Sequence, residues 1–258
     1  MKAYILCDYE GTTGTVSWEE ESTMGPEAMA GDVNAVIAGL KDAGFDEFVV
    51  RDYHSAGRTI VPGALDPAAV LVRGKSTPFP YLLDSRFDAM VFAGAHSMAG
   101  NATGVMSHTM NGDVFDTRIN GTAIGEVGGY ILLAGHFGIP MILVTGDAAA
   151  CREATDMLGD VETAVVKTGL SRTCASCLSP SVARKLIEAH AFAAAKRLKD
   201  FKPLKWDGPF TLEVTFMSPE HADRSRETLK GERIGDRTVR VTGDAVPDVL
   251  QCFERGFK

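Results

Sequence analysis

The stretch that decides the fold is residues 4–11, YILCDYEG, in which an apolar run leads into two carboxylates and a glycine. A short apolar run of this kind is typical of a strand buried in a parallel sheet. Two later stretches have the same form, FVVRDYH at 48–54 and MVFAGAH at 90–96. The recurrence predicts several buried strands whose carboxyl ends carry polar side chains.

The same rhythm of short apolar runs and longer helical patterns continues through most of the chain. Predicted strands lie at Ala3–Cys7, Glu47–Arg51, Ala69–Val72, Ala89–Ala93, Pro140–Val144 and Thr163–Val166. Predicted helices lie at Pro26–Ala43, Ala123–Gly135 and Ala148–Leu158. The alternation predicts an α/β fold, a mostly parallel sheet flanked by helices in three layers. Sheets of this kind bind ligands in the crevice beyond the carboxyl ends of their strands.

The pattern of predicted strands and helices changes near residue 203. Ser179 and Pro180 have the form of an N-cap and a first helical position, so a long helix is predicted over Ser179–Lys199. Beyond the connector, shorter strands and helices are predicted at Phe210–Met217, Glu220–Leu229, Thr238–Val241 and Val246–Arg255. We therefore expect an α/β catalytic domain at 1–203 and a small α+β subdomain at 204–258. Turn residues on both sides of 114–119 predict a hairpin or an irregular excursion within the first domain.

The net charge, the apolar runs and the cysteines of the chain limit which binding partners and cell compartments are expected. The 258 residues carry a formal charge of −8, which disfavours nucleic acid and anionic membranes because both attract basic patches. No apolar run is long enough to span a membrane, and residues 1–8 lack the pattern of a secretory signal, so a cytoplasmic protein is expected. Five cysteines fit reduced thiols better than a disulfide framework. Cys174-x-x-Cys177 lacks a second cysteine pair or a nearby histidine that would complete a metal site.

Acidic and imidazole side chains follow several of the predicted strands. Asp8 and Glu10 leave the first strand on the same side, because side chains alternate along a strand. His54 and His96 follow two other strands. Each alone has an ordinary interpretation, a turn for the acidic pair and a hydrogen-bonded structural residue for a histidine. Together at one sheet edge they predict a site for Zn²⁺, Mn²⁺ or Co²⁺ rather than Ca²⁺, which prefers oxygen ligands.

The middle of the chain adds two further candidates. His108 lies in the glycine-flanked loop GVMSHTM at 104–110. Glu126 lies in the first turns of an apolar helix, where its ordinary interpretation is an acid that favours the helix dipole. The residues around Glu126 are nearly all small or apolar, however. A carboxylate in such surroundings needs a charged partner, which a metal ion would supply.

Taken in order, these motifs resemble those of a known family. Residues 8–11 (DYEG), His54 after RDY, 94–96 (GAH), 104–110 and 125–128 (GEVG) are similar to the D-aminopeptidases of the bacterial dipeptide-transport operon type, which are zinc metallopeptidases. The segment at 171–180 is similar as well, so the resemblance covers most of the chain. Tyr9, Thr12-Thr13 and Thr109 depart from the family pattern, but none of them is a ligand position.

The resemblance implies a role for each matching residue. Asp8 would bridge two zinc ions in each subunit. The other ligands would be Glu10 and His96 for one ion, and His54 and Glu126 for the other. His108 would be the catalytic residue beside the metals. The family also implies a homodecamer whose active sites face an enclosed channel, and substrates with an N-terminal D-amino acid such as D-Ala-D-Ala.

The predicted function is therefore a binuclear-zinc aminopeptidase acting on short peptides with a free N-terminal D-amino acid. Sharing Asp8 gives each ion three protein ligands and leaves an open position, as catalytic zinc requires. A hydroxide bridging the two ions would be the nucleophile. His108 would act on the proton or oxyanion side of the reaction, because imidazole titrates near neutral pH.

Three other functions stay open on the sequence alone. The turn at 11–14 (GTTG) would suit a phosphate, although it matches neither the P-loop nor the dinucleotide-binding pattern. A two-metal site also serves the hydrolysis of other amides and of phosphoesters. The third is a non-catalytic scaffold or binding protein with a structural metal. An open coordination position and the spare His108 argue against this scaffold, because structural zinc sites are closed.

Other polar residues near the predicted crevice have less specific interpretations. Asp52 is predicted either to orient the His54 imidazole or to be a plain surface residue. Asp147 is expected to be a turn or helix-cap residue rather than part of the site. Three further histidines fall in or beside helices away from the crevice and are expected to be structural or exposed; they are His136, His190 and His221.

Overall fold

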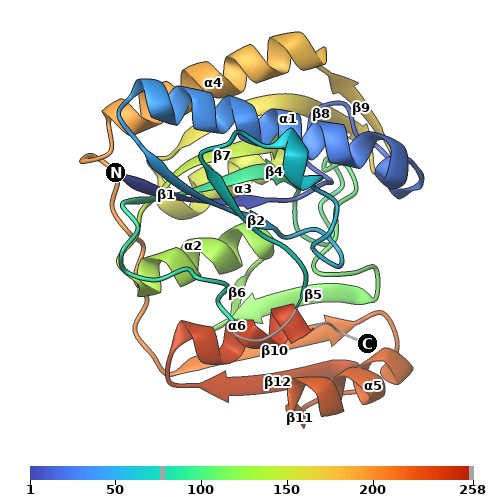
Figure 1. Cartoon of the computed structure of the whole chain (residues 1–258). Coiled ribbons are helices and arrows are strands. Elements are labelled where there is room, and N and C mark those ends of the chain that lie inside the picture. Colours follow the sequence, from blue (N-terminus) through green and yellow to red (C-terminus); the bar gives the residue numbers. More distant parts are fainter. Residues whose placement is uncertain (76–78, 256–258) are drawn as a thin grey trace.

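The computed structural model describes residues 1–75 and 79–255, which form two sheets (Figure 1). The larger sheet has seven strands in the order β3-β2-β1-β4-β7-β8-β9, all parallel to their neighbours except β9. The strands are β1 (Lys2–Cys7), β2 (Glu47–Asp52), β3 (Ala69–Val72), β4 (Ala89–Ala95), β7 (Met141–Asp147), β8 (Glu162–Ser171) and β9 (Cys174–Cys177). The predicted α/β fold with a mostly parallel sheet is confirmed.

Helices cover both faces of this sheet (Figure 1). α1 (Glu21–Asp42) and α4 (Pro180–Lys196) pack together on one face, and α2 (Glu126–His136) and α3 (Ala148–Leu158) pack on the other. Because neither face meets water, β4 and β7 are buried along their whole length and read as continuous apolar runs. Two apolar cores result, one on each side of the sheet.

The second sheet is antiparallel, with five strands in the order β11-β12-β10-β5-β6. Its strands are β5 (Val114–Ile119), β6 (Thr122–Ala123), β10 (Phe210–Phe216), β11 (Glu232–Arg233) and β12 (Thr238–Gly243), accompanied by α5 (Pro219–Leu229) and α6 (Val246–Arg255). The hairpin expected near 114–119 is present, with Asn120 and Gly121 at its turn. Since this sheet joins strands from both sides of residue 203, the division of the chain at that point stays a prediction.

Three element boundaries differ from the prediction for local reasons. α1 begins at Glu21, before the predicted start, because Ser17 caps a short 3-10 turn that leads directly into the helix. α2 begins at Glu126 because residues 122–123 pair with β5 instead of joining the helix. β8 continues to Ser171 because β9, which was not predicted, pairs with its second half.

Candidate metal centre

The carboxyl ends of β2, β1 and β4 lie side by side at one edge of the larger sheet. β1 pairs with both neighbours in parallel, so Asp8, His54 and His96 leave the sheet together. Oδ1 of Asp8 lies 3.1 Å from Nδ1 of His54, and Oδ2 of Asp8 lies 3.4 Å from Nε2 of His96. The two oxygens of one buried carboxylate therefore face two different buried imidazoles.

Two glycines allow this close meeting. Gly94 has a φ of +73°, and a Cβ on it would lie 2.2 Å from the carbonyl oxygen of Asp8. A Cβ on Gly11 would lie 2.0 Å from the carbonyl oxygen of Ala95. A larger residue at either position would push the end of β1 away from the end of β4. The glycines in these motifs thus set the spacing between the side chains that follow the two strands.

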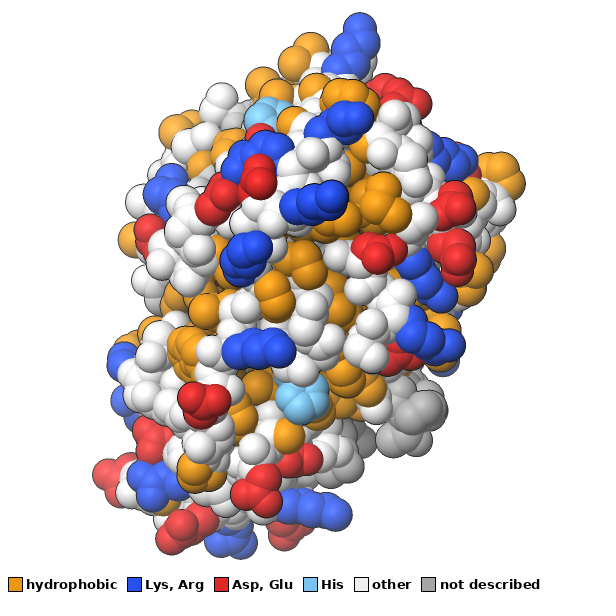
Figure 2. All heavy atoms as spheres, turned by 90° about the vertical axis from the view of Figure 1, so that its left-hand side faces the viewer, with side chains coloured by type: hydrophobic (Ala, Val, Ile, Leu, Met, Phe, Trp, Pro, Cys, Tyr) orange, Lys and Arg blue, Asp and Glu red, His pale blue; other side chains and the backbone are white. Residues whose placement is uncertain are grey.

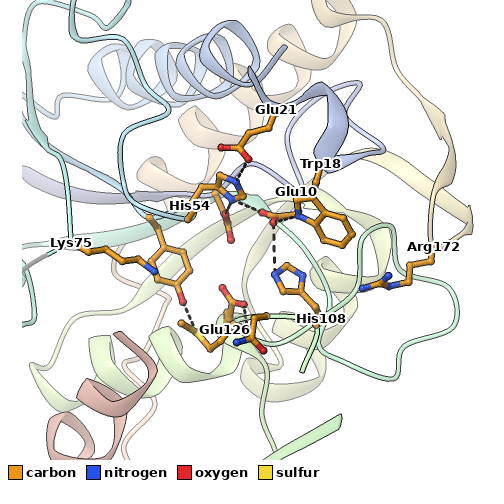
Figure 3. Close-up of a pocket in the computed structure, with 14 residues that line it drawn as sticks. Glu10, Trp18, Glu21, His54, Lys75, His108, Glu126 and Arg172 are labelled. Atoms are coloured by element: carbon orange, nitrogen blue, oxygen red, sulfur yellow. Dashed lines mark hydrogen bonds and ion pairs between the residues drawn. The ribbon is translucent and has the colours of Figure 1, made fainter. Parts of the chain in front are cut away.

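Glu10 joins the cluster between His54 and His108 (Figure 3). Its Oε2 lies 2.9 Å from Nδ1 of His54, and its Oε1 lies 3.7 Å from Nε2 of His108. Oε1 also accepts a hydrogen bond of 2.6 Å from the indole N–H of Trp18. Trp18 therefore orients this carboxylate. Sequence reasoning missed Trp18 because it belongs to the 3-10 turn before α1 and follows no predicted strand.

Glu126 and His108 approach the cluster from the other side. Glu126 is the first residue of α2, and its Oε1 accepts the backbone N–H of Met110 at 2.6 Å and lies 3.4 Å from Nε2 of His96. The ring of His108 stacks on that of His96, with centroids 4.2 Å apart and planes at 9°. Nδ1 of His108 lies 2.8 Å from the carbonyl oxygen of Met106. This carbonyl places a proton on Nδ1 and leaves Nε2 directed towards the carboxylates.

The buried groups of the cluster set one another's charge. Burial raises the pKa of Glu10 and of Glu126, but neighbouring imidazoles overcome this effect. The hydrogen bond and charge of His54 hold the pKa of Glu10 well below its usual range, and the charge of His96 lowers that of Glu126 to about 2. Burial lowers the pKa of His54, yet hydrogen bonds to Asp8 and Glu10 raise it to about 11. Glu10 and Glu126 are therefore held ionised by the positive charge beside them.

The donor set also fits metal ions, which would supply such positive charge. Two groups of three donors have their ligand atoms within 4.8 Å of one another; they are Asp8, Glu10 and His54, and His96, His108 and Glu126. Nε2 of His54 and Nε2 of His96 are buried and form no hydrogen bond within residues 1–75 and 79–255, although carboxylate oxygens lie 3.4 Å from each. Unpartnered imidazole nitrogens beside ionised carboxylates are the ligands that catalytic zinc uses.

This grouping differs in part from the ligand sets that the resemblance implies. Glu10 lies against His54, and Glu126 lies against His96. The resemblance instead assigns Glu10 and His96 to one ion and His54 and Glu126 to the other. Asp8 contacts both imidazoles whichever way the others are divided. The assignment of ligands to individual ions therefore stays a prediction.

All members of the cluster except His96 line a pocket of about 450 Å³, a size typical of small-molecule sites (Figure 3). Other side chains that line it were not identified from the sequence; they are Trp18, Glu21, Tyr53, Lys75 and Arg172. Glu21 lies with its Oε2 3.4 Å from Nε2 of His54. Most of these residues come from loops or a helix start, where no periodic pattern marks them. The one signal was that Arg172 belongs to the 171–180 segment of the family resemblance.

The loop at 10–15, which contains the turn at 11–14, binds a buried ammonium. The ammonium of Lys167 donates to the carbonyl oxygens of Glu10, Thr12 and Thr15 and to the hydroxyl of Thr15, at 2.5 to 3.0 Å. A phosphate cradle needs N–H groups that point inward, but the N–H of Thr13 is already bound by Asp32 at 2.9 Å. The phosphate interpretation of this turn is therefore wrong. Lys167 instead ties the loop that carries Glu10 to β8.

Two acidic residues hold loops around the centre. Asp52 is fully buried, so its interpretation as a surface residue is wrong. Its Oδ2 accepts the N–H of Ile60 at 2.8 Å, which fixes the loop after β2 rather than the His54 ring itself. Asp147 is the N-cap residue of α3, as expected, and its Oδ2 accepts the N–H of Val105 at 3.1 Å. Asp147 thereby also anchors the loop after β4.

The other histidines and the cysteine pair lie outside this pocket. His190 and His221 sit beside carboxylates of other elements, and His136 is exposed at the end of α2, as expected. Cys174 and Cys177 are exposed on β9, and the cysteines of the described residues form no disulfide.

Comparisons with known proteins identify the family and the fold of the chain. A model of the D-aminopeptidase family matches residues 1–255. The D-aminopeptidase of Bacillus subtilis strain 168 is 32% identical over 263 residues, covering 98% of this chain and 94% of the relative. A solved structure described as a zinc-dependent D-aminopeptidase from Bacillus subtilis, a self-compartmentalizing protease, has a TM-score of 0.93 and 30% identity, covering 98% of this chain and 95% of that one. The chain therefore belongs to the D-aminopeptidase family.

Proposed function

We propose that this protein is a two-zinc aminopeptidase that hydrolyses short peptides carrying a free N-terminal D-amino acid. The observation that carries the proposal is the buried cluster of carboxylates and imidazoles that lines a 450 Å³ pocket. The related D-aminopeptidases, one of them zinc-dependent and of the same fold, support zinc as the metal and a D-amino acid as the first residue of the substrate.

Five side chains would hold the two ions, namely Asp8, Glu10, His54, His96 and Glu126. Asp8 is the shared ligand in this proposal because its two oxygens face two different imidazoles. Zinc, when bound, lowers the pKa of a water molecule towards about 7 and polarises a carbonyl group, which supplies both a nucleophile and an activated substrate. The N–H groups of Trp18 and Met110 orient the Glu10 and Glu126 carboxylates for this task.

His108 is placed to move a proton during the reaction. Its ring is held by the Met106 carbonyl at 2.8 Å and by stacking on His96, while Nε2 stays directed towards the pocket. A neutral imidazole in this orientation accepts a proton from the attacking water and donates it to the leaving amine. In its protonated form, the same ring stabilises the oxyanion of the tetrahedral intermediate.

We also propose that the protein works as a homodecamer with its active sites facing an enclosed channel. The related structure described as self-compartmentalizing supports an assembly of this kind. Large apolar side chains on the surface, such as Val70, Phe115 and Leu170, support buried contacts between copies. Light scattering coupled to size-exclusion chromatography measures the mass directly. A mass of ten chains would support the assembly, and a monomer mass would refute it.

A small peptide is the partner that the surface supports best. On the face shown in Figure 2, basic side chains are interspersed with acidic and apolar ones, and the net charge of −8 disfavours nucleic acid and anionic membranes. In the described part of the chain, no helix is both long and apolar enough to cross a bilayer. Cysteines that form no disulfide in the described residues support a cytoplasmic location.

Hydrolysis of D-Ala and L-Ala p-nitroanilides by the zinc-loaded protein tests the proposed function. We expect release of p-nitroaniline from the D-substrate, and loss of that release when phenanthroline removes the zinc. Re-addition of zinc should restore it, which separates metal removal from unfolding. Hydrolysis that phenanthroline leaves unchanged would refute the metal role, and turnover of the L-substrate alone would refute the stereochemistry.

A further inference from the structure

We propose that Arg172 binds the C-terminal carboxylate of the substrate, so that the pocket selects dipeptides with a free carboxylate. This inference rests on the proposed function, because it assumes a peptide whose scissile bond lies at the metal centre. Arg172 belongs to the turn between β8 and β9, and its side chain points towards the same pocket as His108 (Figure 3).

The guanidinium of Arg172 is held in place by its surroundings. Its Nε–H donates to the carbonyl oxygen of Ser107 at 3.2 Å, and its Cζ lies 5.1 Å from the centre of the Trp18 ring. Its backbone carbonyl accepts the N–H of Met106 at 2.7 Å. A planar guanidinium fixed in this way loses little conformational entropy when it binds an anion, and its N–H groups match the two oxygens of a carboxylate.

The charge of Arg172 has no counterpart in the described part of the chain. Some arginines elsewhere lie against carboxylates, as Arg86 does with Asp84 and Arg240 with Glu213, whereas Arg152 and Arg237 contact a hydroxyl and a carbonyl oxygen instead. Within residues 1–75 and 79–255 no carboxylate lies within ion-pair distance of Arg172, and no hydrogen bond uses its two Nη groups. A fixed guanidinium with free Nη groups at the wall of a pocket is arranged for an anion that comes from outside.

The order of charges along the pocket fits a peptide of two residues. Glu21 lies against His54 on one side of the centre, and Arg172 lies beside Trp18 and His108 on another (Figure 3). The ammonium of the substrate would face Glu21, and its carboxylate would face Arg172. Since one extended residue spans about 3.3–3.6 Å, the carboxylate of a dipeptide lies only one residue beyond the scissile bond.

Two neighbouring features bear on the alternatives, which are a carboxylate bound by Lys75 and a substrate longer than a dipeptide. Lys75 lies on the opposite side of the same pocket, but no described contact fixes its ammonium (Figure 3). Beyond Arg172 lies a second hollow of about 440 Å³, which is also lined by His108 and Phe115. A longer peptide would have to pass the guanidinium to enter that hollow, so we expect dipeptides to be preferred over longer chains.

The test compares D-Ala-D-Ala with its C-terminal amide in the zinc-loaded protein. In the Arg172→Met variant we expect kcat/KM for the dipeptide to fall about 10- to 100-fold, mainly through KM, while that for the amide changes less than about threefold. Arg172→Lys should lie between, because it keeps the charge without the fork. Arg86→Met is the matched control, since Arg86 pairs with Asp84 outside the pocket. Zinc content and the thermal midpoint should not change in any variant.

Three results would overturn the assignment. Equal losses on both substrates would indicate that Arg172 acts through the loop of Ser107 and His108. If Lys75→Met abolishes the preference for the dipeptide over its amide while Arg172→Met keeps it, the carboxylate is bound by Lys75 and not by Arg172. If the wild-type protein cleaves no peptide, the proposed function fails instead. In that case, calorimetry of the uncleaved dipeptide still tests whether Arg172 binds its carboxylate. Equal affinity of the wild-type and Arg172→Met proteins would overturn the inference.

Discussion

Charged side chains are buried at the edge of the larger sheet but remain accessible to water on the second sheet. At the carboxyl edge of the larger sheet, Asp8, Glu10 and Glu126 are buried together. On the second sheet, Glu213 pairs with Arg240 at 2.8 Å, and both side chains stay accessible to water. Buried ions are strongly destabilising unless fully paired, whereas exposed pairs contribute little either way. The comparison shows that the first region gathers carboxylates and imidazoles in the protein interior, in groups that could hold metal ions.

Strand direction explains why, among the described residues, the larger sheet carries this centre and the second sheet carries none. β2, β1 and β4 run parallel, so the residues that follow all three strands meet at one edge. In the second sheet, β10 runs antiparallel to both β5 and β12, so the residues after successive strands go to opposite edges. A concentration of ligands at strand ends is therefore a property of the parallel sheet.

Substitution of the shared carboxylate should have the largest effect. We expect Asp8→Asn to lower kcat/KM by about 10³-fold or more, because the metal centre contributes several kcal/mol to the transition state. Zinc content should fall at the same time. Asp116→Asn on β5, which removes an exposed partner of Arg118, is the matched control and should change neither quantity. If Asp8→Asn keeps both zinc and turnover, Asp8 is not the shared ligand.

The His108→Ala variant separates chemistry from metal binding. We expect zinc content to stay unchanged and turnover to fall by about 10²-fold, as for the loss of an acid–base or oxyanion-stabilising group. His190→Ala, which alters a histidine paired with Glu162 outside the pocket, should keep full turnover. Unchanged turnover in His108→Ala would exclude this residue from the reaction, and loss of zinc would make it a ligand.

Removal of the buried ammonium of Lys167 should act mainly on the stability of the fold rather than on catalysis. The Lys167→Met variant removes four hydrogen bonds of a buried ammonium, at about 0.5–1.5 kcal/mol each, so we expect the free energy of unfolding to fall by about 2–6 kcal/mol. Lys41→Met, which breaks only the exposed pair with Asp66, should change it by less than about 1 kcal/mol. Urea unfolding measures both. Equal losses would show that the Lys167 contacts add nothing beyond a surface pair.

The smallest effect is expected on the second sheet. Arg240→Met removes the partner of Glu213, and we expect the free energy of unfolding to change by less than about 1 kcal/mol, with turnover unaffected. The same urea and p-nitroanilide measurements apply. A loss as large as that of Lys167→Met would contradict the contrast between the two sheets.

The sequence predicted the part of the site that depends on local pattern. Asp8, His54 and His96 follow apolar runs, and the rule for parallel sheets places such residues at one edge. Trp18 and Arg172 could not be found in this way, because a 3-10 turn and a strand–strand turn bring them to the pocket. The segment CASC of β9 has no apolar alternation, so the strand itself was missed. The pairing of β5 with β10 joins distant residues, which local periodicity does not reveal.

Zinc titration of the metal-free protein, followed by calorimetry and by metal analysis after dialysis, tests the central claim most directly. We predict that two zinc ions bind each chain and that the thermal midpoint rises as they bind, because a ligand of the folded state stabilises that state. Hydrolysis of D-Ala p-nitroanilide should appear with the bound zinc. Full activity with one ion or none, or zinc binding that survives the loss of the Asp8 carboxylate unchanged, would contradict a paired metal centre built on these five side chains.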